Sequence, residues 1–436
     1  MKQTSKIKST NLKLVVIGLG YVGLPLAVEF GKKRNVIGFD IDEKRISDLK
    51  ENKDFNLEVS QKDLKSAKYL SLTNKSSKIS NSNCYIVTVP TPINNNKEPD
   101  LNPLKRATET IGQILKYNDI VIYESTVYPG VTEEICVPIL EKTSGLKFNK
   151  EFYCGYSPER VNPGDKEHRI NTIKKVTSGS TPYIANVIDN LYNDIITVGT
   201  HKAESIKIAE AAKIIENTQR DLNIALINEL AIIFNKLKID TTKVLDAAGS
   251  KWNFLPFKPG LVGGHCIGVD PYYLTHKARM IGYTPEIILS GRKINDQMPD
   301  YISKKTIELL KNKGFNVKNS NILVLGLSFK ENCPDLRNSK TLDLIYNLQE
   351  FGCKVTAHDP VVNVNETKKN FNFFTSDWES IQKVDAIILA VPHLQYFEMT
   401  MDKILQKLKP NRIVVDIKSF FDINVVKEKG HEIWRL

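Results

Sequence analysis

Short apolar runs alternate with amphipathic stretches over most of the chain. The run Leu12–Ile17 opens the first such region, and Asn321–Leu327 opens a second one. Runs of this kind, apolar at successive positions, are typical of parallel strands buried on both faces, and helices connect such strands. The pattern predicts an α/β protein with two parallel-sheet domains. The further strands predicted are Val36–Phe39, Cys84–Val89, Ile120–Glu124, Phe152–Tyr156, Lys354–His358, Asp385–Val391 and Arg412–Ile417.

The stretch from Lys202 to Lys236 has Ala and Leu at helical spacing and contains neither Pro nor Gly. At 3.6 residues per turn it predicts a helix of about nine turns, long enough to join two domains or to form a dimer spine. The predicted organisation is a disordered tail (1–11), an N-terminal domain (12–201), a central helical domain (202–305) and a C-terminal domain (306–436).

The segment GLGYVG, Gly18–Gly23, lies between the first strand and a helix, and Asp40 follows the second strand. This spacing is the dinucleotide fingerprint of Rossmann-like domains, in which the glycines allow a tight turn, close approach to a pyrophosphate and close helix packing. Asp40 would bond ribose hydroxyls and repel a 2′-phosphate, which favours NAD over NADP. Arg45 either flanks the adenosine or is a solvated helix residue. Within the fingerprint, the predicted cofactor contacts are Gly18, Gly20, Tyr21 and Gly23.

Polar residues also follow the later strands of this domain. Thr91 and Thr126 come at carboxyl ends of strands, where doubly wound sheets bind ligands, so both are predicted to touch the cofactor. Glu159 and Arg160 follow another strand and either belong to the site or form a loop ion pair.

On the long helix, Lys213 and Asn217 are four residues apart and share a face, with Arg220 close by. A lysine in this otherwise apolar stretch either snorkels to solvent or has a task. Beside an NAD domain, Lys213 and Asn217 would stabilise a developing alkoxide during oxidation of a C–OH group.

The stretch Trp252–Tyr273 is dense in Gly, Pro and aromatic residues and holds Cys266, which predicts a structured loop that presents this thiol. A thiolate adds to an aldehyde as a thiohemiacetal, whose oxidation gives a thioester that water hydrolyses. One cysteine and two NAD would thus take an alcohol to an acid. Lys213 nearby would favour the thiolate, and Asp270 or Glu159 would act as base or hold the attacking water.

The second domain lacks the GxGxxG segment after its first strand. Lys330, Arg337 and Lys418 instead predict phosphate binding through side chains, which fits a nucleotide-linked substrate.

Composition narrows the class of protein further. The 436 residues carry a net charge of +11, but Lys and Arg are interleaved with acids, which favours a solvated surface over nucleic-acid binding. The six cysteines form no CxxC pair, so we expect reduced thiols in a cytoplasm, no metal, and inert buried thiols apart from Cys266. His265 and His276 lack metal-ligand spacing. No run is long enough to span a membrane, and the polar N-terminus does not resemble a signal peptide.

The chain resembles the nucleotide-sugar 6-dehydrogenases over essentially its whole length. The motifs that carry the resemblance are GLGYVG, TVPTP, ESTVYPG, SPERVNPGD, EAAKIIENT, NFLPFKPGLVGGHCIGVD, SGRKIND and LSFKENCPDLRNSK. The resemblance implies a four-electron oxidation of C6 with Cys266 as nucleophile, Lys213 and Asn217 stabilising oxyanions, and Asp270, Glu159 and Thr126 positioning water. It adds Val22, Asp40, Arg45, Thr91, Thr126 and Arg337 as cofactor positions. On the nucleotide-sugar side it implies Glu159, Arg160, Val161, Lys213, Asn217, Arg220, Asn253, Phe254, Phe257, Gly260, Gly263, Phe329, Lys330 and Lys418. Arg292 matches an arginine that reaches a neighbouring subunit's site, which implies a homodimer or higher homo-oligomer.

One departure narrows the substrate. UDP-glucose dehydrogenases usually have a lysine before the aspartate of the cysteine loop, and this chain has Val269. With His265 before Cys266 and PYYL after Asp270, the chain is similar to the branch acting on UDP-N-acetylglucosamine or UDP-N-acetylgalactosamine for capsule or O-antigen polysaccharide. The alternatives are UDP-glucose, UDP-N-acetylmannosamine, a two-electron 3-hydroxyacid-type dehydrogenase that has no use for Cys266, and a non-enzymatic nucleotide sensor.

Overall fold

The structure is a computed structural model that describes residues 7–56, 58–94, 96–160, 169–375 and 377–436. The described chain groups into two compact units. Unit 1 comprises Met1–Glu216 and Tyr272–Thr284, and unit 2 comprises Asn217–Pro271 and Pro285–Leu436. The boundary falls within the long helix α7, Ile206–Leu237.

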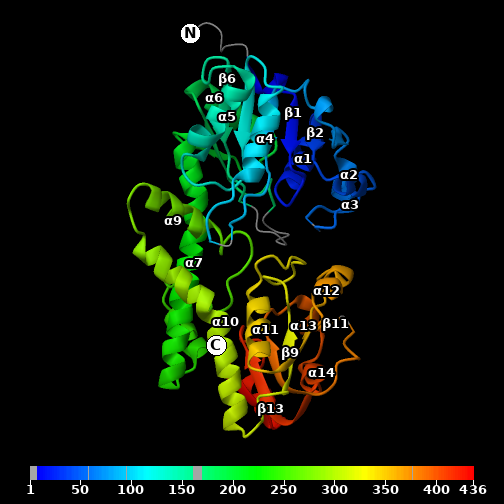
Figure 1. Ribbon diagram of the computed structural model, residues 1–436, viewed down its shortest axis with the longest axis vertical. Coiled ribbons are helices and arrows are strands. Elements are labelled where there is room, and N and C mark those ends of the chain that lie inside the picture. Colours follow the sequence, from blue (N-terminus) through cyan, green and yellow to red (C-terminus); the bar gives the residue numbers. More distant parts are fainter. Residues whose placement is uncertain (1–6, 57, 95, 161–168, 376) are drawn as a thin grey trace. The chain divides into compact units, whose positions relative to one another are not determined.

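Unit 1 is built on a sheet with the strand order β3-β2-β1-β4-β5-β6-β7-β8 among the described residues. Neighbouring strands are parallel except for the β6–β7 pair. The strands are β1 Leu14–Ile17, β2 Val36–Phe39, β3 Leu70–Thr73, β4 Cys84–Val87, β5 Asp119–Tyr123, β6 Phe152–Tyr156, β7 Lys175–Gly179 and β8 Thr200–Lys202. The helices are α1 Gly23–Gly31, α2 Glu43–Lys50, α3 Gln61–Ser66, α4 Asn102–Gly112, α5 Val137–Ser144, α6 Pro182–Asn193 and most of α9, Asp270–Met280 (Figure 1).

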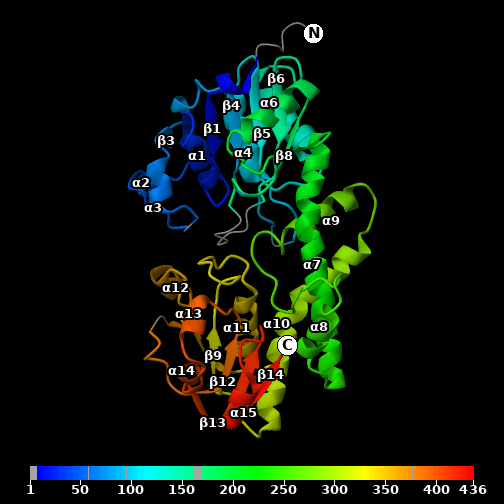
Figure 2. The ribbon, with the colours of Figure 1, turned by 180° about the vertical axis from the view of Figure 1, so that it is seen from behind.

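Unit 2 repeats the first part of this topology with the all-parallel order β11-β10-β9-β12-β13-β14. Its strands are β9 Asn321–Leu325, β10 Lys354–His358, β11 Phe374–Thr375, β12 Val384–Leu389, β13 Leu408–Asp416 and β14 Glu432–Arg435. Its helices are α8 Thr241–Gly249, α10 Glu286–Asn312, α11 Lys340–Glu350, α12 Val364–Asn370, α13 Leu394–Glu398, α14 Met401–Leu405 and α15 Ile423–Glu428. Figure 2 shows these elements from behind.

Strand β9 explains why its sheet is buried on both sides. Ile322 and Val324 pack into a core with α10 and α11, whereas Leu323 and Leu325 pack into a second core with α13, α14 and α15. Successive side chains of a strand point to opposite faces, so an unbroken apolar run buries both. The predicted α/β fold with two Rossmann-like parallel sheets is confirmed.

Two local predictions need correction. Residues 7–11 are not a loose tail: Ile7 is buried, Tyr183 Oη donates a 2.6 Å hydrogen bond to its carbonyl, and Ser9–Asn11 form a 3-10 turn. The predicted loop Trp252–Tyr273 ends earlier than expected, because α9 begins at Asp270. An aspartate followed by Pro271 is a favourable start for a helix, since proline lacks the N–H that a first turn leaves unpaired.

Candidate active site

The glycine-rich turn after β1 has the geometry that the fingerprint requires. Gly18 has φ +93°, and a Cβ on Gly23 would lie 1.8 Å from the Gly18 carbonyl oxygen, so both positions need glycine. A Cβ on Gly20 would meet nothing within 4 Å, which leaves the backbone open to a close ligand. Tyr21 and Val22, both partly exposed, lead directly into α1. These residues fit a dinucleotide pyrophosphate at the helix N-terminus.

Asp40 follows β2 and is held from the protein side. Its Oδ2 accepts from Leu19 N at 2.7 Å and its Oδ1 accepts from Asp42 N at 3.0 Å. The side chain stays partly exposed, and each oxygen retains a lone pair for a ribose hydroxyl.

Arg45 is fixed rather than solvated. Its Nε donates to Leu19 O at 3.0 Å and its Nη1 pairs with Asp54 at 2.7 Å. Its Nη2 is buried and bonds to nothing in the described chain. This donor beside the Asp40 turn fits a polar group of the cofactor's adenosine end, and the solvated-residue alternative does not fit the burial.

The two predicted threonines lie together in unit 1. Thr91 Oγ1 donates to Thr126 O at 2.7 Å, and Tyr273 Oη donates to Thr91 O at 2.8 Å. Both threonines are partly exposed at the carboxyl ends of β4 and β5. The predicted cofactor contacts of this sheet edge are therefore neighbours.

Glu159 and Arg160, in the loop after β6, differ in burial and in their contacts. Glu159 is buried at 8% exposure, whereas Arg160 pairs with Glu216 at 2.8 Å and donates to Lys174 O. Arg160 thus forms an ion pair with a helix residue. Val161 lies outside the described residues.

A buried lysine that sequence reasoning missed supports the same loop. Lys175 Nζ pairs with Glu124 at 2.5 Å and donates to Pro158 O at 3.1 Å, immediately before Glu159. Tyr192 Oη also donates to Glu124. Lys175 lies in an alternating strand pattern, and only its low exposure marks it as more than a surface residue.

Helix α7 carries the predicted oxyanion residues. Lys213 is 5% exposed and Asn217 is 8% exposed, so Lys213 does not snorkel to solvent, while Arg220 is exposed. Glu210, one turn before Lys213, accepts from Gly130 N at 2.6 Å and from Thr132 N at 2.9 Å. Burial raises the pKa of Glu210 to about 7.

The Cys266 loop belongs to unit 2 and is bonded to the second sheet's connections. Gly264 N donates to Asn338 O and Asn338 Nδ2 donates to Gly264 O, both at 3.3 Å. A Cβ on Gly263 would lie 2.5 Å from Asn338 O, and one on Gly264 would lie 2.6 Å from the Phe329 ring. The glycine pair is therefore required for close packing of the loop against these residues, and Cys266 itself is partly exposed.

Asp270 closes the loop. Its backbone N donates to Cys266 O at 2.8 Å, and its Oδ2 accepts from Asn217 Nδ2 at 2.6 Å. Asp270 is fully buried, and Val269 beside it is 3% exposed. Two of the predicted catalytic residues, Asn217 of α7 and Asp270 at the start of α9, are thus in direct contact, and Asp270 is also bonded to the backbone of Cys266.

The start of the loop is held by a residue that the sequence pattern did not single out. Asn228 of α7 donates to Gly260 O at 3.0 Å and accepts from Gly260 N at 2.8 Å. It also donates to Asn295 of α10 at 2.8 Å. An asparagine in an apolar helical stretch is the only sequence signal for this role.

Next to Gly260 lies a cavity of about 280 Å³ between α8, the loop and the end of β13. Phe254, Phe257 and Lys418 line it, and a Cβ on Gly260 would lie 2.8 Å from Lys418 Nζ. The predicted substrate residues of this part therefore meet around one cavity, while Asn253 is exposed and does not line it.

A carboxylate links the cysteine loop to Arg337. Asp335 pairs with Arg337 Nη2 at 2.6 Å, and its Oδ2 lies 3.5 Å from His265 Nδ1. Burial alone would raise the pKa of Asp335, but the hydrogen bonds and charge of Arg337 hold it below its usual value. The His265 ring packs edge-on against the Phe329 ring, with centroids 5.4 Å apart. Lys330 Nζ lies 5.8 Å from the centroid of the Phe329 ring.

Arg292 of α10 is 2% exposed. It pairs with Asp221 and Asp296, each at 2.6 Å. In this chain Arg292 thus joins α7 to α10, and its role in a neighbouring subunit's site stays a prediction.

The other thiols are buried and unsuited to chemistry. Cys84, Cys136, Cys154, Cys333 and Cys353 are buried and unbridged. Burial raises the pKa of Cys136 to about 12 and that of Cys353 to about 11. Among the described cysteines, Cys266 alone is partly exposed.

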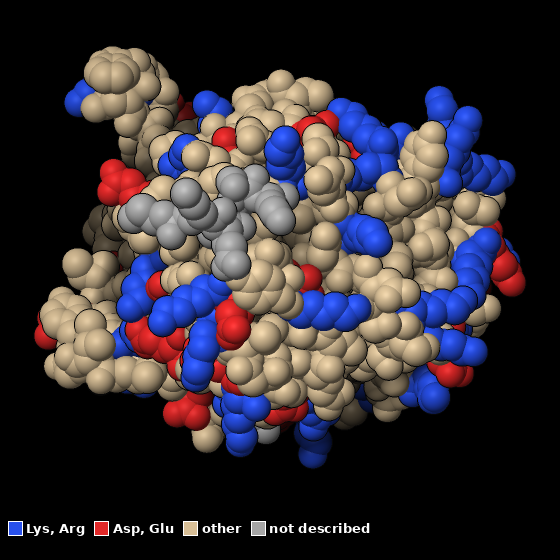
Figure 3. Space-filling model, turned by 90° about the horizontal axis from the view of Figure 1, so that it is seen from above, with Lys and Arg blue, Asp and Glu red and all other residues tan. Residues whose placement is uncertain are grey.

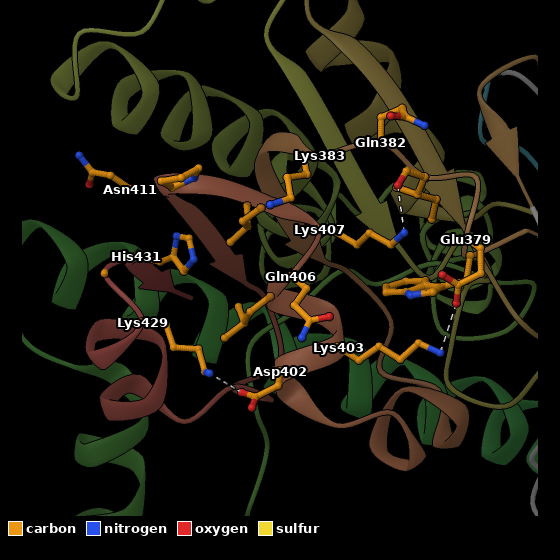
Figure 4. Close-up of a pocket in the computed structure, with 16 residues that line it drawn as sticks. Glu379, Gln382, Lys383, Asp402, Lys403, Gln406, Lys407, Asn411, Lys429 and His431 are labelled. Carbon is orange, nitrogen blue, oxygen red and sulfur yellow. Dashed lines mark hydrogen bonds and ion pairs between the residues drawn. The ribbon is translucent and has the colours of Figure 1, made fainter.

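A second hollow lies at the amino ends of β12 and β13 (Figure 4). Its lysines are largely paired, Lys429 with Asp402 at 2.9 Å and Lys403 with Glu379 at 3.5 Å. Ligands of parallel sheets bind at the opposite, carboxyl ends. This hollow is therefore no part of the predicted site.

Surface charge is mixed on the face drawn in Figure 3, where Lys and Arg are scattered among acidic and uncharged residues. In the part of the chain that the structure describes, no helix is long and apolar enough to cross a membrane, and no group of three or more His, Cys, Asp and Glu is placed to hold a metal.

The fingerprint turn and the largely parallel sheet of unit 1 are typical of a dinucleotide-binding protein. Models of the UDP-glucose/GDP-mannose dehydrogenase family match residues 12–196 (NAD binding domain), 207–297 (central domain) and 323–423 (UDP binding domain). The chain belongs to this family, and it is an NAD-dependent nucleotide-sugar dehydrogenase.

Individual relatives cover nearly the whole chain. The UDP-N-acetyl-D-glucosamine 6-dehydrogenase of Salmonella typhi is 58% identical, over 93% of this chain and 96% of that protein. The enzyme of the same name from Pseudomonas aeruginosa is 57% identical, over 94% and 98%. The solved structure of a UDP-D-ManNAc dehydrogenase from Pyrococcus horikoshii has a TM-score of 0.87 at 28% identity, covering 97% and 99%.

Proposed function

We propose that the protein oxidises the C6 hydroxymethyl group of a UDP-N-acetylhexosamine, UDP-GlcNAc or UDP-GalNAc, to the uronic acid. The observation that carries the proposal is the partly exposed Cys266 in a loop bonded to the UDP-binding part of the chain. A thiol there has a use in a four-electron oxidation and none in a two-electron one. Relatives named for UDP-GlcNAc are 57% and 58% identical, whereas those named for UDP-N-acetylmannosamine are about 30% identical.

The first half of the reaction takes the alcohol to the aldehyde. Bound NAD supplies the hydride acceptor in both halves. Lys213 and Asn217 donate hydrogen bonds to the developing alkoxide as the hydroxyl proton leaves O6 for solvent and the hydride leaves C6. The buried position of both side chains keeps them ordered and strengthens each hydrogen bond.

The second half begins when the Cys266 thiolate adds to the aldehyde carbon and gives a thiohemiacetal. Loss of a second hydride from this tetrahedral carbon leaves a thioester on Cys266. Water, oriented by Asp270, Glu159 and Thr126, adds to the thioester, and departure of the thiolate yields the carboxylate and the free cysteine. Two NAD are consumed for each sugar.

The nucleotide end is held by the cavity of Phe254, Phe257 and Lys418 with the Phe329–Lys330 segment. Aromatic rings suit a uracil base and lysines suit the diphosphate. Gly260 and Gly263 bring the backbone close to the sugar, and Arg160, Val161, Arg220, Asn253 and Arg337 complete the proposed contacts to the two ligands.

We also infer that the enzyme works as a homodimer in the cytoplasm, supplying surface polysaccharide synthesis. Along α7 the side chains of Ile208, Ile215, Leu226, Ile233 and Leu237 are each at least 44% exposed, an apolar stripe that a second copy would cover. Reduced thiols fit the compartment. Light scattering of the purified protein measures the oligomer, and a monomer would contradict that inference.

The test of the reaction is to measure NADH formation with excess NAD and one UDP-sugar at a time: UDP-GlcNAc, UDP-GalNAc, UDP-ManNAc or UDP-glucose. We expect two NADH per sugar and turnover of an N-acetylated gluco or galacto substrate well above the other two. One NADH per sugar would favour a two-electron dehydrogenase. Comparable turnover of UDP-glucose would overturn the substrate assignment.

A further inference from the structure

The turn after the first strand of each sheet is built in the same way. Gly18 N donates to Phe39 O at 2.8 Å in unit 1, and Gly326 N donates to His358 O at 2.9 Å in unit 2. Leu19 N donates to Asp40 Oδ2 at 2.7 Å, and Leu327 N donates to Asp359 Oδ2 at 2.7 Å. Asp359 is therefore the positional counterpart of the ribose-binding aspartate.

The two aspartates differ in what remains for a ligand. Asp40 is partly exposed and accepts two backbone hydrogen bonds. Asp359 is 1% exposed and accepts from five donors. These are the backbone N–H groups of Leu327, Ser328, Val361 and Val362 and the Nε2 of His393 at 3.0 Å. A carboxylate has about four lone-pair sites, so Asp359 has no capacity left for a ribose.

His393, at the N-cap of α13, fixes the same turn with both ring nitrogens. Its Nδ1 accepts from Asn332 N at 3.0 Å, which leaves the proton on Nε2, where it faces Asp359 Oδ2. Nε2 also lies 3.2 Å from Ser328 Oγ, which donates to Lys330 O at 2.8 Å. The ring is fully buried. His393 thus contacts Ser328 and Asn332, the residues that flank the segment containing Phe329 and Lys330.

We propose that the Asp359–His393 pair is a positioning device that holds the segment Ser328–Asn332 in the shape that binds the nucleotide diphosphate of the sugar substrate. Asp359 occupies the position that Asp40 has in unit 1, but its carboxylate is already saturated by protein donors. In the described chain, unit 2 therefore lacks the acceptor that a dinucleotide ribose would need. This inference rests on the proposed function, because it assigns Phe329 and Lys330 to the substrate.

The test compares UDP binding with NAD use in His393→Ala. We expect the Kd for UDP, measured by calorimetry, and the KM for the UDP-sugar to rise about tenfold, as for one or two lost hydrogen bonds. The KM for NAD and kcat should stay within about twofold, since both depend on other residues. A merely structural histidine would lower the melting temperature without separating the two KM values.

Conservative variants divide the two bonds. His393→Gln retains a donor toward Asp359, and His393→Asn retains an acceptor toward Asn332, so each should recover part of the UDP affinity. Ser328→Ala is a milder change in the segment itself and should weaken UDP binding about threefold. It replaces His393→Ala in the test if that variant does not fold. His358→Asn is the matched control, since His358 is also buried but bonds to Tyr396 and not to the segment.

A double-variant cycle tests the route of the effect. In a Lys330→Ala background, His393→Ala should weaken UDP binding little further, because both changes remove the same contact. Unchanged UDP affinity in folded His393→Ala, or an equal rise in both KM values, would overturn the proposal. Failure of the wild-type protein to bind UDP would instead overturn the proposed function.

Discussion

The side-chain amide of Asn217 donates a 2.6 Å hydrogen bond to the carboxylate of Asp270, and both groups are buried. The bond orients the amide of Asn217 and ties the end of the cysteine loop to α7. Asn217 is proposed to donate to the substrate oxyanion and Asp270 to orient the attacking water, so this bond fixes the two groups relative to each other.

Replacing Asn217 by Ala should lower kcat by about a hundredfold, the size expected when one oxyanion donor is lost. Asn217→Asp should be at least as damaging, because two buried carboxylates would repel each other. Steady-state NADH formation measures the effect. Gln219→Ala, on the exposed side of the same helix, is the control, and an equal loss there would show that the helix rather than the amide is at fault.

Cys266→Ser should stop the reaction after the first hydride, because a hydroxyl is a much poorer nucleophile toward the aldehyde. The expected yield falls from two NADH per sugar to one or fewer. Mass spectrometry of the wild-type protein, quenched during turnover, should detect a sugar bound to Cys266. Cys353→Ala changes a buried thiol of the same unit and should leave the yield at two NADH per sugar. Full four-electron oxidation by Cys266→Ser would contradict the covalent route.

Asn228→Ala should raise the KM for the UDP-sugar with little change in the KM for NAD, because it frees Gly260 beside the Lys418 cavity. Loss of this buried amide should also cost about 1–3 kcal/mol of stability. Kinetics and calorimetry measure the two effects. Asn223→Ala, which removes a side chain that bonds only to its own helix in the described structure, should change neither.

Glu210 predicts a pH dependence of stability. Burial raises its pKa from 4.5 to about 7, so between these pH values the folded protein retains a proton that the unfolded chain has lost. The stabilisation is fully present below about pH 4.5 and is lost as pH rises through 7, a change on the order of 3 kcal/mol. The melting temperature of the wild-type protein should therefore fall more steeply than that of Glu210→Gln between pH 5 and pH 7.5. Parallel slopes would show that Glu210 keeps an ordinary pKa.

Central strands could be predicted closely from sequence, since burial on both faces leaves an unbroken apolar run. Val36–Phe39 and Phe152–Tyr156 follow this rule and begin and end as predicted. Lys354–His358 also begins and ends as predicted, although Lys354 is exposed and Thr356 is partly exposed. Edge strands such as β3, with partly exposed alternate residues, lack this signal. The predicted start of the long helix at Lys202 was early, because Ser205 Oγ accepts from Ile208 N and the helix begins at Ile206.

The residues of the candidate site also differ in how well the sequence predicts them. Residues with a local signature, such as Gly18, Asp40 and the GGHC segment, could be identified by their spacing. Asn228, Asp335 and His393 could not, because each acts through a partner distant in sequence and only the folded chain brings the pair together.

The hydrogen bonds that hold the cysteine loop within unit 2 bear on when the cofactor is exchanged during the proposed reaction. Gly260 and Gly264 are bonded to residues of the unit that contains the UDP-binding domain, whereas the fingerprint turn belongs to unit 1. In the proposed route, a half-oxidised sugar attached to Cys266 would be held by residues of unit 2 and not by the fingerprint turn. That route would let NADH be exchanged for NAD while the sugar stays bound to Cys266, so that no free aldehyde is released.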